Sequence, residues 1–113
     1  MSPRNWKFRV EDILGAINAI EGYTRNMTPE SFSADPRTLD AVLHNISVMG
    51  EAATCIPDEI AQQFPEIPWD KMRAIRNLVV HMYFGIRKDI LWQTVRQDLP
   101  ELIPHLKRML QPV

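Results

Sequence analysis

The chain has 113 residues, of which 45% are hydrophobic and 24% charged, a composition typical of a globular domain rather than a disordered or fibrous chain. Thirteen basic and fourteen acidic residues leave a net charge of −1, which excludes a strongly basic coat for nucleic acid but leaves a local basic patch open. A single cysteine, Cys55, excludes an internal disulfide, and no Cys/His cluster has zinc-type spacing, so we expect no metal and no cofactor.

The N-terminal residues are charged and lack the apolar core of a signal peptide. No apolar run approaches the roughly 18 residues needed to cross a bilayer. We therefore expect a cytoplasmic protein without membrane contact. No repeat, low-complexity stretch or linker interrupts the chain, so residues 1–113 are predicted to form a single domain.

Apolar residues recur at helical spacing almost throughout, and no stretch shows the period of two that marks a strand. The first helix is predicted over Lys7–Arg25. Its apolar stripe consists of Val10, Ile13, Leu14, Ile17 and Ile20. Thr28-Pro29-Glu30 then combines a capping residue with proline at the first helical position, and predicts at most a short helical turn.

A second long helix begins at Asp35-Pro36, which repeats the cap-and-proline signal, and ends at Ile56-Pro57. Its core stripe consists of Leu39, Val42, Leu43, Ile46, Met49 and Ala53. A short helix that begins at Pro57 and stops at Pro65 is predicted to follow it.

A third long helix is predicted from Trp69 to Phe84, with Gly85 as its stop. The last helical segment begins near Lys88, is kinked or restarted at Asp98–Pro100, and continues to about Leu110. Four main helices with short connections predict an all-α fold, an antiparallel four-helix bundle with an additional short helix.

The third long helix is unusual because apolar side chains occur on both of its faces. An unbroken helix would turn one set toward the core: Met72, Ile75, Leu78, Val79 and Met82. The opposite face would carry Arg73, Asn77, Val80, His81 and Phe84. A face that mixes apolar groups with Arg, Asn and His indicates a partner, most simply a second copy of the chain, so we expect a symmetric homodimer.

A motif in this helix carries a family resemblance. The segment RNLVVHMY at residues 76–83 matches Arg-x4-His-x-Tyr and resembles the signature of the HepT toxins, which belong to the HEPN superfamily. Met49–Ala53, Pro68-Trp69 and Asp98–Leu102 resemble further landmarks of the same family. Arg-x4-His alone is a weak signal, but the ordered set covers about Lys7–Leu110 and is fairly specific.

The resemblance implies a metal-independent endoribonuclease toxin that acts on RNA as a homodimer. It also implies a partner, an MntA-type minimal nucleotidyltransferase antitoxin. In that family the antitoxin transfers AMP from ATP onto the motif's tyrosine, here Tyr83, and so silences the toxin. The protein would then be the toxin of a type VII-like toxin–antitoxin pair.

The motif residues suit cleavage of RNA by attack of its own 2′-hydroxyl on the neighbouring phosphate. His81 titrates near neutral pH and can relay a proton, while Arg76 carries a permanent forked charge suited to phosphate oxygens. Asn77 can donate to phosphate or hold the imidazole one turn away, and Tyr83 can stack on a base or position the phosphate. AMP on Tyr83 would add bulk and negative charge where the RNA phosphate must enter.

Helix geometry limits this arrangement. An unbroken helix separates Arg76 and His81 by about 140° and roughly 7.5 Å, so both face one phosphate only if the helix loosens or a second protomer completes the site. We also expect Arg73 to bind phosphate, because an unbroken helix places it on one stripe with Asn77 and His81. The attraction for RNA is expected to come from a local basic cluster of Arg73, Arg76, Arg87 and Lys88.

Other roles stay open for these residues. Arg76 can form an ion pair with Glu51 across the bundle, which also makes Glu51 a candidate for orienting the site. Asn77 and His81 can serve a dimer interface, and Tyr83 can pack against the core. The rival function is a non-catalytic binding partner or modification substrate of a nucleotidyltransferase.

The second helix carries Asp40, His44, Ser47 and Glu51 on one polar face, an order that mimics an Asp-His-Ser relay. No nucleophile elbow or glycine-rich oxyanion loop accompanies these residues, and a helix face holds such groups poorly. A hydrolase triad is therefore not expected.

Overall fold

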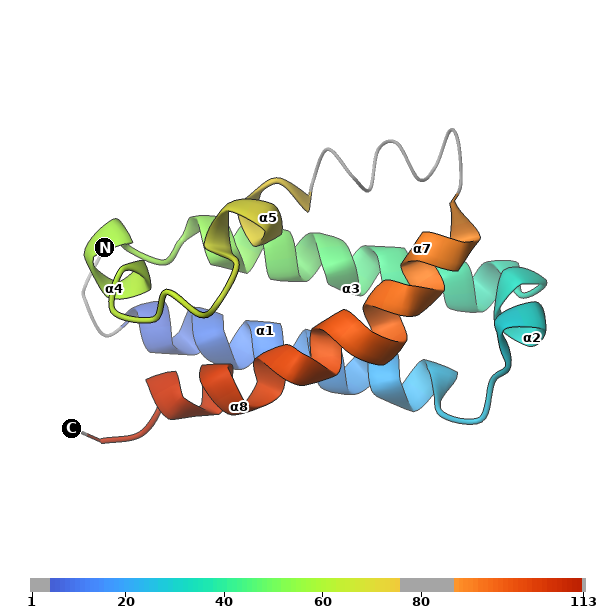
Figure 1. Ribbon diagram of the computed structural model, residues 1–113, viewed down its shortest axis with the longest axis horizontal. Helices are drawn as coiled ribbons and strands as arrows, with labels where there is room; N and C mark the ends of the chain where they lie inside the picture. The colour runs from blue at the N-terminus through green and yellow to red at the C-terminus, as the bar shows by residue number, and fades with distance from the viewer. Residues whose placement is uncertain (1–4, 76–86, 113) are drawn as a thin grey trace.

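The computed structural model describes residues 5–75 and 87–112, and within these ranges the chain is helical without any strand (Figure 1). The predicted site residues Arg76, Asn77, His81 and Tyr83 lie outside the described residues. The elements in chain order are α1 (Asn5–Thr24), α2 (Pro29–Ser33), α3 (Pro36–Thr54), α4 (Asp58–Ala61), α5 (Trp69–Arg73), α7 (Lys88–Gln93), the π-helical turn η1 (Thr94–Asp98) and α8 (Leu99–Met109).

Two long antiparallel helices, α1 and α3, lie side by side along the long axis of the molecule (Figure 1). A third rod, formed by α7, η1 and α8 in continuous succession and called the C-terminal rod below, crosses them and packs on α1. The described part of the chain thus contains three of the four long helices of the predicted bundle. None of the described helices is long and apolar enough to cross a membrane.

Local capping explains where α2 and α3 begin. The Asp35 carboxylate accepts hydrogen bonds from the N–H groups of Arg37 and Thr38, at 3.1 and 3.3 Å, and from the Thr38 hydroxyl at 2.9 Å. Thr28 and Ser31 form a reciprocal capping box ahead of α2. These side chains satisfy N–H groups that a helix start otherwise leaves without partners, which confirms both predicted starts.

The core is built from the predicted apolar stripes. Buried members of the α1 stripe are Val10, Ile13, Ile17 and Ile20, with Leu14 half-buried. All six predicted positions of α3 are buried, namely Leu39, Val42, Leu43, Ile46, Met49 and Ala53. The C-terminal rod contributes Leu91, Val95, Leu99, Leu102, Leu106 and Met109. Ile90, near the start of the rod, is 41% exposed, and Cys55, directly after α3, is half-buried.

The predicted helix from Trp69 to Phe84 is wrong as a single unbroken element. α5 ends at Arg73, Ala74 is its C-cap with φ −80° and ψ −5°, and beyond Ile75 the segment lies outside the described residues. Arg73 and Ile75 hold the end of α5 on α3, and these tertiary contacts override a local sequence pattern that favours a continuous helix. The prediction that Arg73 shares one stripe with Asn77 and His81 assumed an unbroken helix, and it stays a prediction because both of those residues lie outside the described part of the chain.

The last helical segment was predicted to be kinked or restarted at Asp98–Pro100, and the structure has an irregular, π-helical turn directly before this point, whose form proline explains. Pro100 has no N–H to donate to the Arg96 carbonyl, and its ring would clash with that carbonyl in a regular α-helix. The five-residue π-helical turn η1 ends immediately before Leu99 and Pro100. The wider turn lets the rod continue through a residue that would otherwise end it.

Candidate functional site

Two of the six predicted site residues, Glu51 and Arg73, lie among the described residues, and they belong to neighbouring elements. Glu51 is exposed on α3 and directly follows Gly50. Arg73 is the last residue of α5, with its side chain 27% exposed. The helices that carry these two residues are in contact, because α5 packs on the C-terminal half of α3 (Figure 1).

Gly50 allows α5 and α3 to approach closely. A Cβ atom at this position would overlap the Cγ2 methyl group of Ile75 and lie 3.2 Å from the Met72 carbonyl oxygen. Ile75 and Met72 are both buried against α3. The absence of a side chain at Gly50 therefore lets α5 and the following Ile75 pack directly on α3, just ahead of the motif at residues 76–83 in the sequence.

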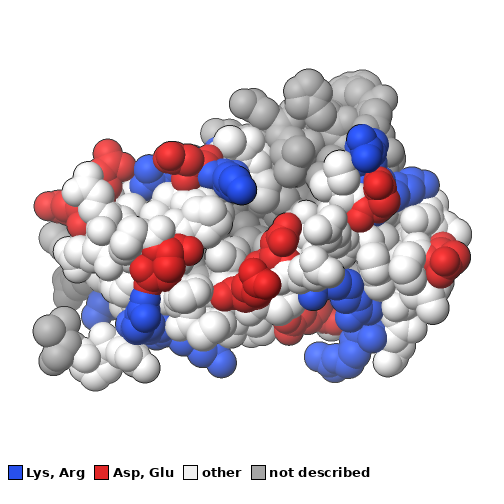
Figure 2. Space-filling model, in the orientation of Figure 1, with Lys and Arg blue, Asp and Glu red and all other residues white. Residues whose placement is uncertain are grey.

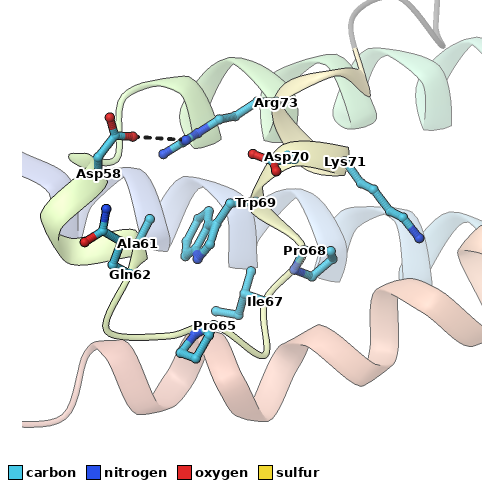
Figure 3. Close-up of a pocket in the computed structure, with 10 residues that line it drawn as sticks. All are labelled: Asp58, Ala61, Gln62, Pro65, Ile67, Pro68, Trp69, Asp70, Lys71 and Arg73. Atoms are coloured by element: carbon cyan, nitrogen blue, oxygen red, sulfur yellow. Dashed lines mark hydrogen bonds and ion pairs between the residues drawn. The ribbon is translucent and has the colours of Figure 1, made fainter.

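The Arg73 guanidinium is bound on three sides. Nε donates to the Ala53 carbonyl at 3.3 Å and Nη2 to the Ile56 carbonyl at 3.1 Å, both at the C-terminal end of α3. Nη1 donates to the Asp58 carboxylate at 3.2 Å (Figure 3). Helix ends carry carbonyls without intrahelical partners and partial negative charge, so a cation is stabilised there.

A pocket of about 530 Å³ opens beside Arg73, between α4, the following loop and α5 (Figure 3). Trp69 projects toward Ala61 and Ile67 in this view, and its ring N–H donates to the Phe64 carbonyl at 3.1 Å. Two acidic and two basic residues line the same space, namely Asp58, Asp70, Lys71 and Arg73. No histidine is among the described lining residues, so they offer no imidazole for the predicted proton relay. Sequence reasoning did not anticipate this pocket.

The predicted basic cluster does not form as one patch among its described members. Lys88 donates to the Ser33 carbonyl at 2.9 Å, and Arg87 pairs with Asp89 at 3.4 Å. Hydrogen bonding from Arg87 lowers the pKa of the Asp89 carboxyl. Both basic residues lie at the α7 end of the molecule, away from Arg73 on α5 (Figure 1). On the face shown in Figure 2, basic and acidic groups are interspersed.

The polar face of α3 does not hold a formed relay. Ser47 donates its hydroxyl proton to the Leu43 carbonyl of its own helix at 3.1 Å. His44 is exposed on the same helix. A serine hydroxyl committed to a helix carbonyl has given up the proton that a histidine base would have to remove.

Comparison with known proteins points to one family. The family described as "Ribonuclease HepT-like" matches residues 13–109, a range that includes the RNLVVHMY motif. No solved structure gives a significant match.

Curated relatives carry ribonuclease names. The "Probable ribonuclease HepT" of Thermococcus cleftensis is 40% identical over 99 residues, which is 88% of this chain and 90% of that protein. A putative RNase of Methanocaldococcus jannaschii is 32% identical over 102 residues, 90% of this chain and 94% of that protein. The predicted resemblance is thereby confirmed, and the chain belongs to the HepT-like ribonuclease family.

Proposed function

We propose that this chain is a metal-independent endoribonuclease that acts as a homodimer in the cytoplasm and is the toxin of a type VII-like toxin–antitoxin pair. The observation that carries the proposal is the RNLVVHMY motif at residues 76–83, inside the range matched by the HepT-like ribonuclease family. Membership of the HepT-like ribonuclease family supports the ribonuclease activity.

Arg76 and His81 are the proposed catalytic residues. The 2′-hydroxyl oxygen of RNA attacks the adjacent phosphorus, a P–O2′ bond forms, and the P–O5′ bond breaks to leave a cyclic phosphate and a 5′-hydroxyl. An imidazole accepts the 2′-hydroxyl proton, and an imidazolium returns a proton to the departing 5′-oxygen. Arg76 stabilises the charge on the phosphate oxygens. A symmetric dimer would supply both imidazoles from two copies of His81.

Three further residues complete the proposed site. Asn77 donates to the phosphate or orients His81, and Tyr83 stacks on a base or positions the phosphate. Glu51 is a candidate for orienting Arg76, since it is exposed on α3 beside the position where α5 packs.

The proposed regulation acts on Tyr83. An MntA-type minimal nucleotidyltransferase would attach AMP to its hydroxyl, with pyrophosphate as the leaving group of ATP. The added phosphate would repel the RNA backbone, and the adenosine would occupy its path. Incubation with the cognate nucleotidyltransferase and ATP should add AMP mass to the Tyr83 peptide and stop cleavage in proportion.

The deciding experiment is cleavage of labelled single-stranded RNA in EDTA, after mass spectrometry has established that Tyr83 is unmodified. Wild-type protein should cut, and His81→Ala should lose at least about a hundredfold in rate while light scattering still shows a dimer. His44→Ala, which removes an exposed histidine of α3, should cut at the wild-type rate.

Absence of cleavage by dimeric, unmodified wild-type protein would contradict the proposal. It would favour the rival function, a non-catalytic partner or modification substrate of a nucleotidyltransferase. Cleavage by His81→Ala at the wild-type rate would remove His81 from the mechanism.

A further inference from the structure

The hydrogen bonds of Arg73 use both edges of its guanidinium. The edge formed by Nε and Nη2 faces two main-chain carbonyls, of Ala53 at 3.3 Å and of Ile56 at 3.1 Å. The other edge is engaged through Nη1, which donates to Asp58 at 3.2 Å. Arginine recognises a phosphate or carboxylate best through two parallel N–H groups of one edge, and neither edge of Arg73 has both of its nitrogen atoms without an acceptor.

The surroundings of Arg73 also disfavour a phosphate ligand. The Asp58 carboxylate beside the guanidinium has a side chain 83% exposed, so it faces the solvent from which RNA would arrive. The Ala53 and Ile56 carbonyls add the negative end of α3. An incoming phosphate would therefore meet three acceptor groups around a cation that they already satisfy.

The same contacts fix α5 relative to α3. Trp69 anchors the first residue of α5 through its bond to the Phe64 carbonyl, and Arg73 anchors the last residue to the end of α3. Ile75 then packs over Gly50 with no room for a side chain between them. In the sequence the motif begins at the next residue.

We infer that Arg73 is a positioning residue for RNA cleavage and does not contact RNA. This inference rests on the proposed ribonuclease function. The guanidinium acts through α5, whose end it holds against α3, and so determines where the chain enters the motif of residues 76–83. It replaces the sequence-based prediction that Arg73 binds phosphate.

The test separates catalytic rate from RNA affinity in variants that are folded at the assay temperature. Arg73→Ala should lower kcat about tenfold or more, because small displacements of catalytic groups are costly, while KM for RNA changes less than about twofold. Lys71→Ala is the matched control. It removes the same charge from the same short helix, and its side chain points away from Arg73 (Figure 3). We expect it to keep the wild-type kcat.

A positioning role and a phosphate-binding role of Arg73 predict different kinetic results for two further variants. Arg73→Lys retains the charge but cannot span two carbonyls and a carboxylate, so a positioning role predicts that kcat stays low. Asp58→Asn removes only the anionic partner, so it should lower kcat modestly at unchanged KM. If Arg73 bound phosphate, Asp58→Asn would free its charge and lower KM, and Arg73→Lys would restore most of the affinity.

The inference is overturned if Arg73→Ala raises KM at constant kcat and reduces the salt dependence of RNA binding by about 0.7, the contribution of one phosphate contact on a single strand. In that case wild-type cleavage still supports the proposed function. Absence of cleavage by the wild type would overturn the proposed function, and this inference with it.

Discussion

Basic side chains distant in sequence hold the C-terminal ends of three helices. Arg73 bonds to the end of α3, Lys88 to the Ser33 carbonyl at the end of α2, and Arg96 to the Thr24 carbonyl at the end of α1. Each supplies donors to carbonyls that lack an intrahelical partner, and each places positive charge at the negative end of a helix dipole. A basic residue in this protein is therefore not automatically part of an RNA-binding surface.

Gly50 and Gly15 provide a matched pair of glycine-to-alanine substitutions. Gly50→Ala should destabilise the protein by about 1 kcal/mol, because the new methyl group overlaps the stiff β-branched Ile75 and this cost exceeds the gain in helix propensity. Gly15→Ala, on a face of α1 where a Cβ meets nothing within 4 Å, should stabilise by up to about 1 kcal/mol. Urea unfolding measures both, and equal effects of the two substitutions would contradict the close approach at Gly50.

Asp35 predicts a pH-dependent contribution to stability. Its pKa lies below the ordinary value of 3.8, first because the Thr38 hydroxyl donates to the carboxylate and then because the Thr38 N–H does. A lowered pKa in the folded state means that ionised Asp35 favours folding. Its contribution is complete only well above the ordinary value of 3.8 and is lost as the pH falls through the lowered pKa. The Tm deficit of Asp35→Ala should therefore be larger at pH 7 than near pH 2.5, and a deficit that grows with acidity would contradict the cap.

The C-terminal rod contains a π-helical turn, η1, and from this turn an arginine side chain binds the end of α1. Arg96, in the π-helical turn η1, donates to the carbonyls of Thr24, Arg25 and Met27. Its guanidinium also lies 4.4 Å from the ring centroid of Trp92, which packs on Phe32 with a centroid distance of 5.0 Å. Arg96 thus connects the end of α1 to Trp92, the residue of the rod that packs on Phe32 of α2.

Arg96→Ala should cost about 1–2 kcal/mol of unfolding free energy, since the Thr24 carbonyl at the end of α1 and the Met27 carbonyl beyond it lose the guanidinium donor and Trp92 loses its cation. The exposed Lys107→Ala on α8 is the control and should change stability by less than about 0.5 kcal/mol. Denaturant midpoints measure the difference. Equal midpoints for the two variants would show that the Arg96 contacts contribute nothing.

At the scale of the whole molecule, the numbers of acidic and basic residues are nearly equal. The net charge is −1, and Figure 2 shows both signs over one face. The described members of the predicted basic cluster bind to carbonyls and carboxylates of the protein itself. A protein with nearly balanced charge attracts the RNA backbone only weakly at long range. We therefore expect its preference for particular RNA sequences to depend on contacts in the catalytic site rather than on the charge of the surface.

This charge balance predicts a shallow salt dependence of RNA binding. The slope of log affinity against log salt for single-stranded RNA should be smaller in magnitude than about 2, equivalent to fewer than about three phosphate contacts per protomer. Fluorescence anisotropy over a salt series measures the slope. A markedly steeper slope would indicate an extended basic surface that the described residues do not provide.

The sequence by itself determined the helical nature of the described chain, the starts of α2 and α3, the buried stripes of α1 and α3 and the irregular turn before Pro100. These features depend on interactions between residues a few positions apart, such as a cap, a missing N–H or a repeated apolar position, which can be read along the chain. The family resemblance was also readable, because its motif is a short segment of fixed spacing.

Only the tertiary structure decided that α5 ends at Arg73 and that the Arg73 guanidinium faces the end of α3. The local pattern favoured a helix that continued past this point, with Arg73 turned toward a partner. Packing at Gly50 and bonds to carbonyls 17 and 20 residues earlier in the chain outweighed that preference. Helix propensity contributes roughly tenths of a kcal/mol per residue to stability, whereas each tertiary hydrogen bond contributes about 1 kcal/mol. A few long-range contacts therefore suffice to end a helix and to hold an arginine side chain against another helix.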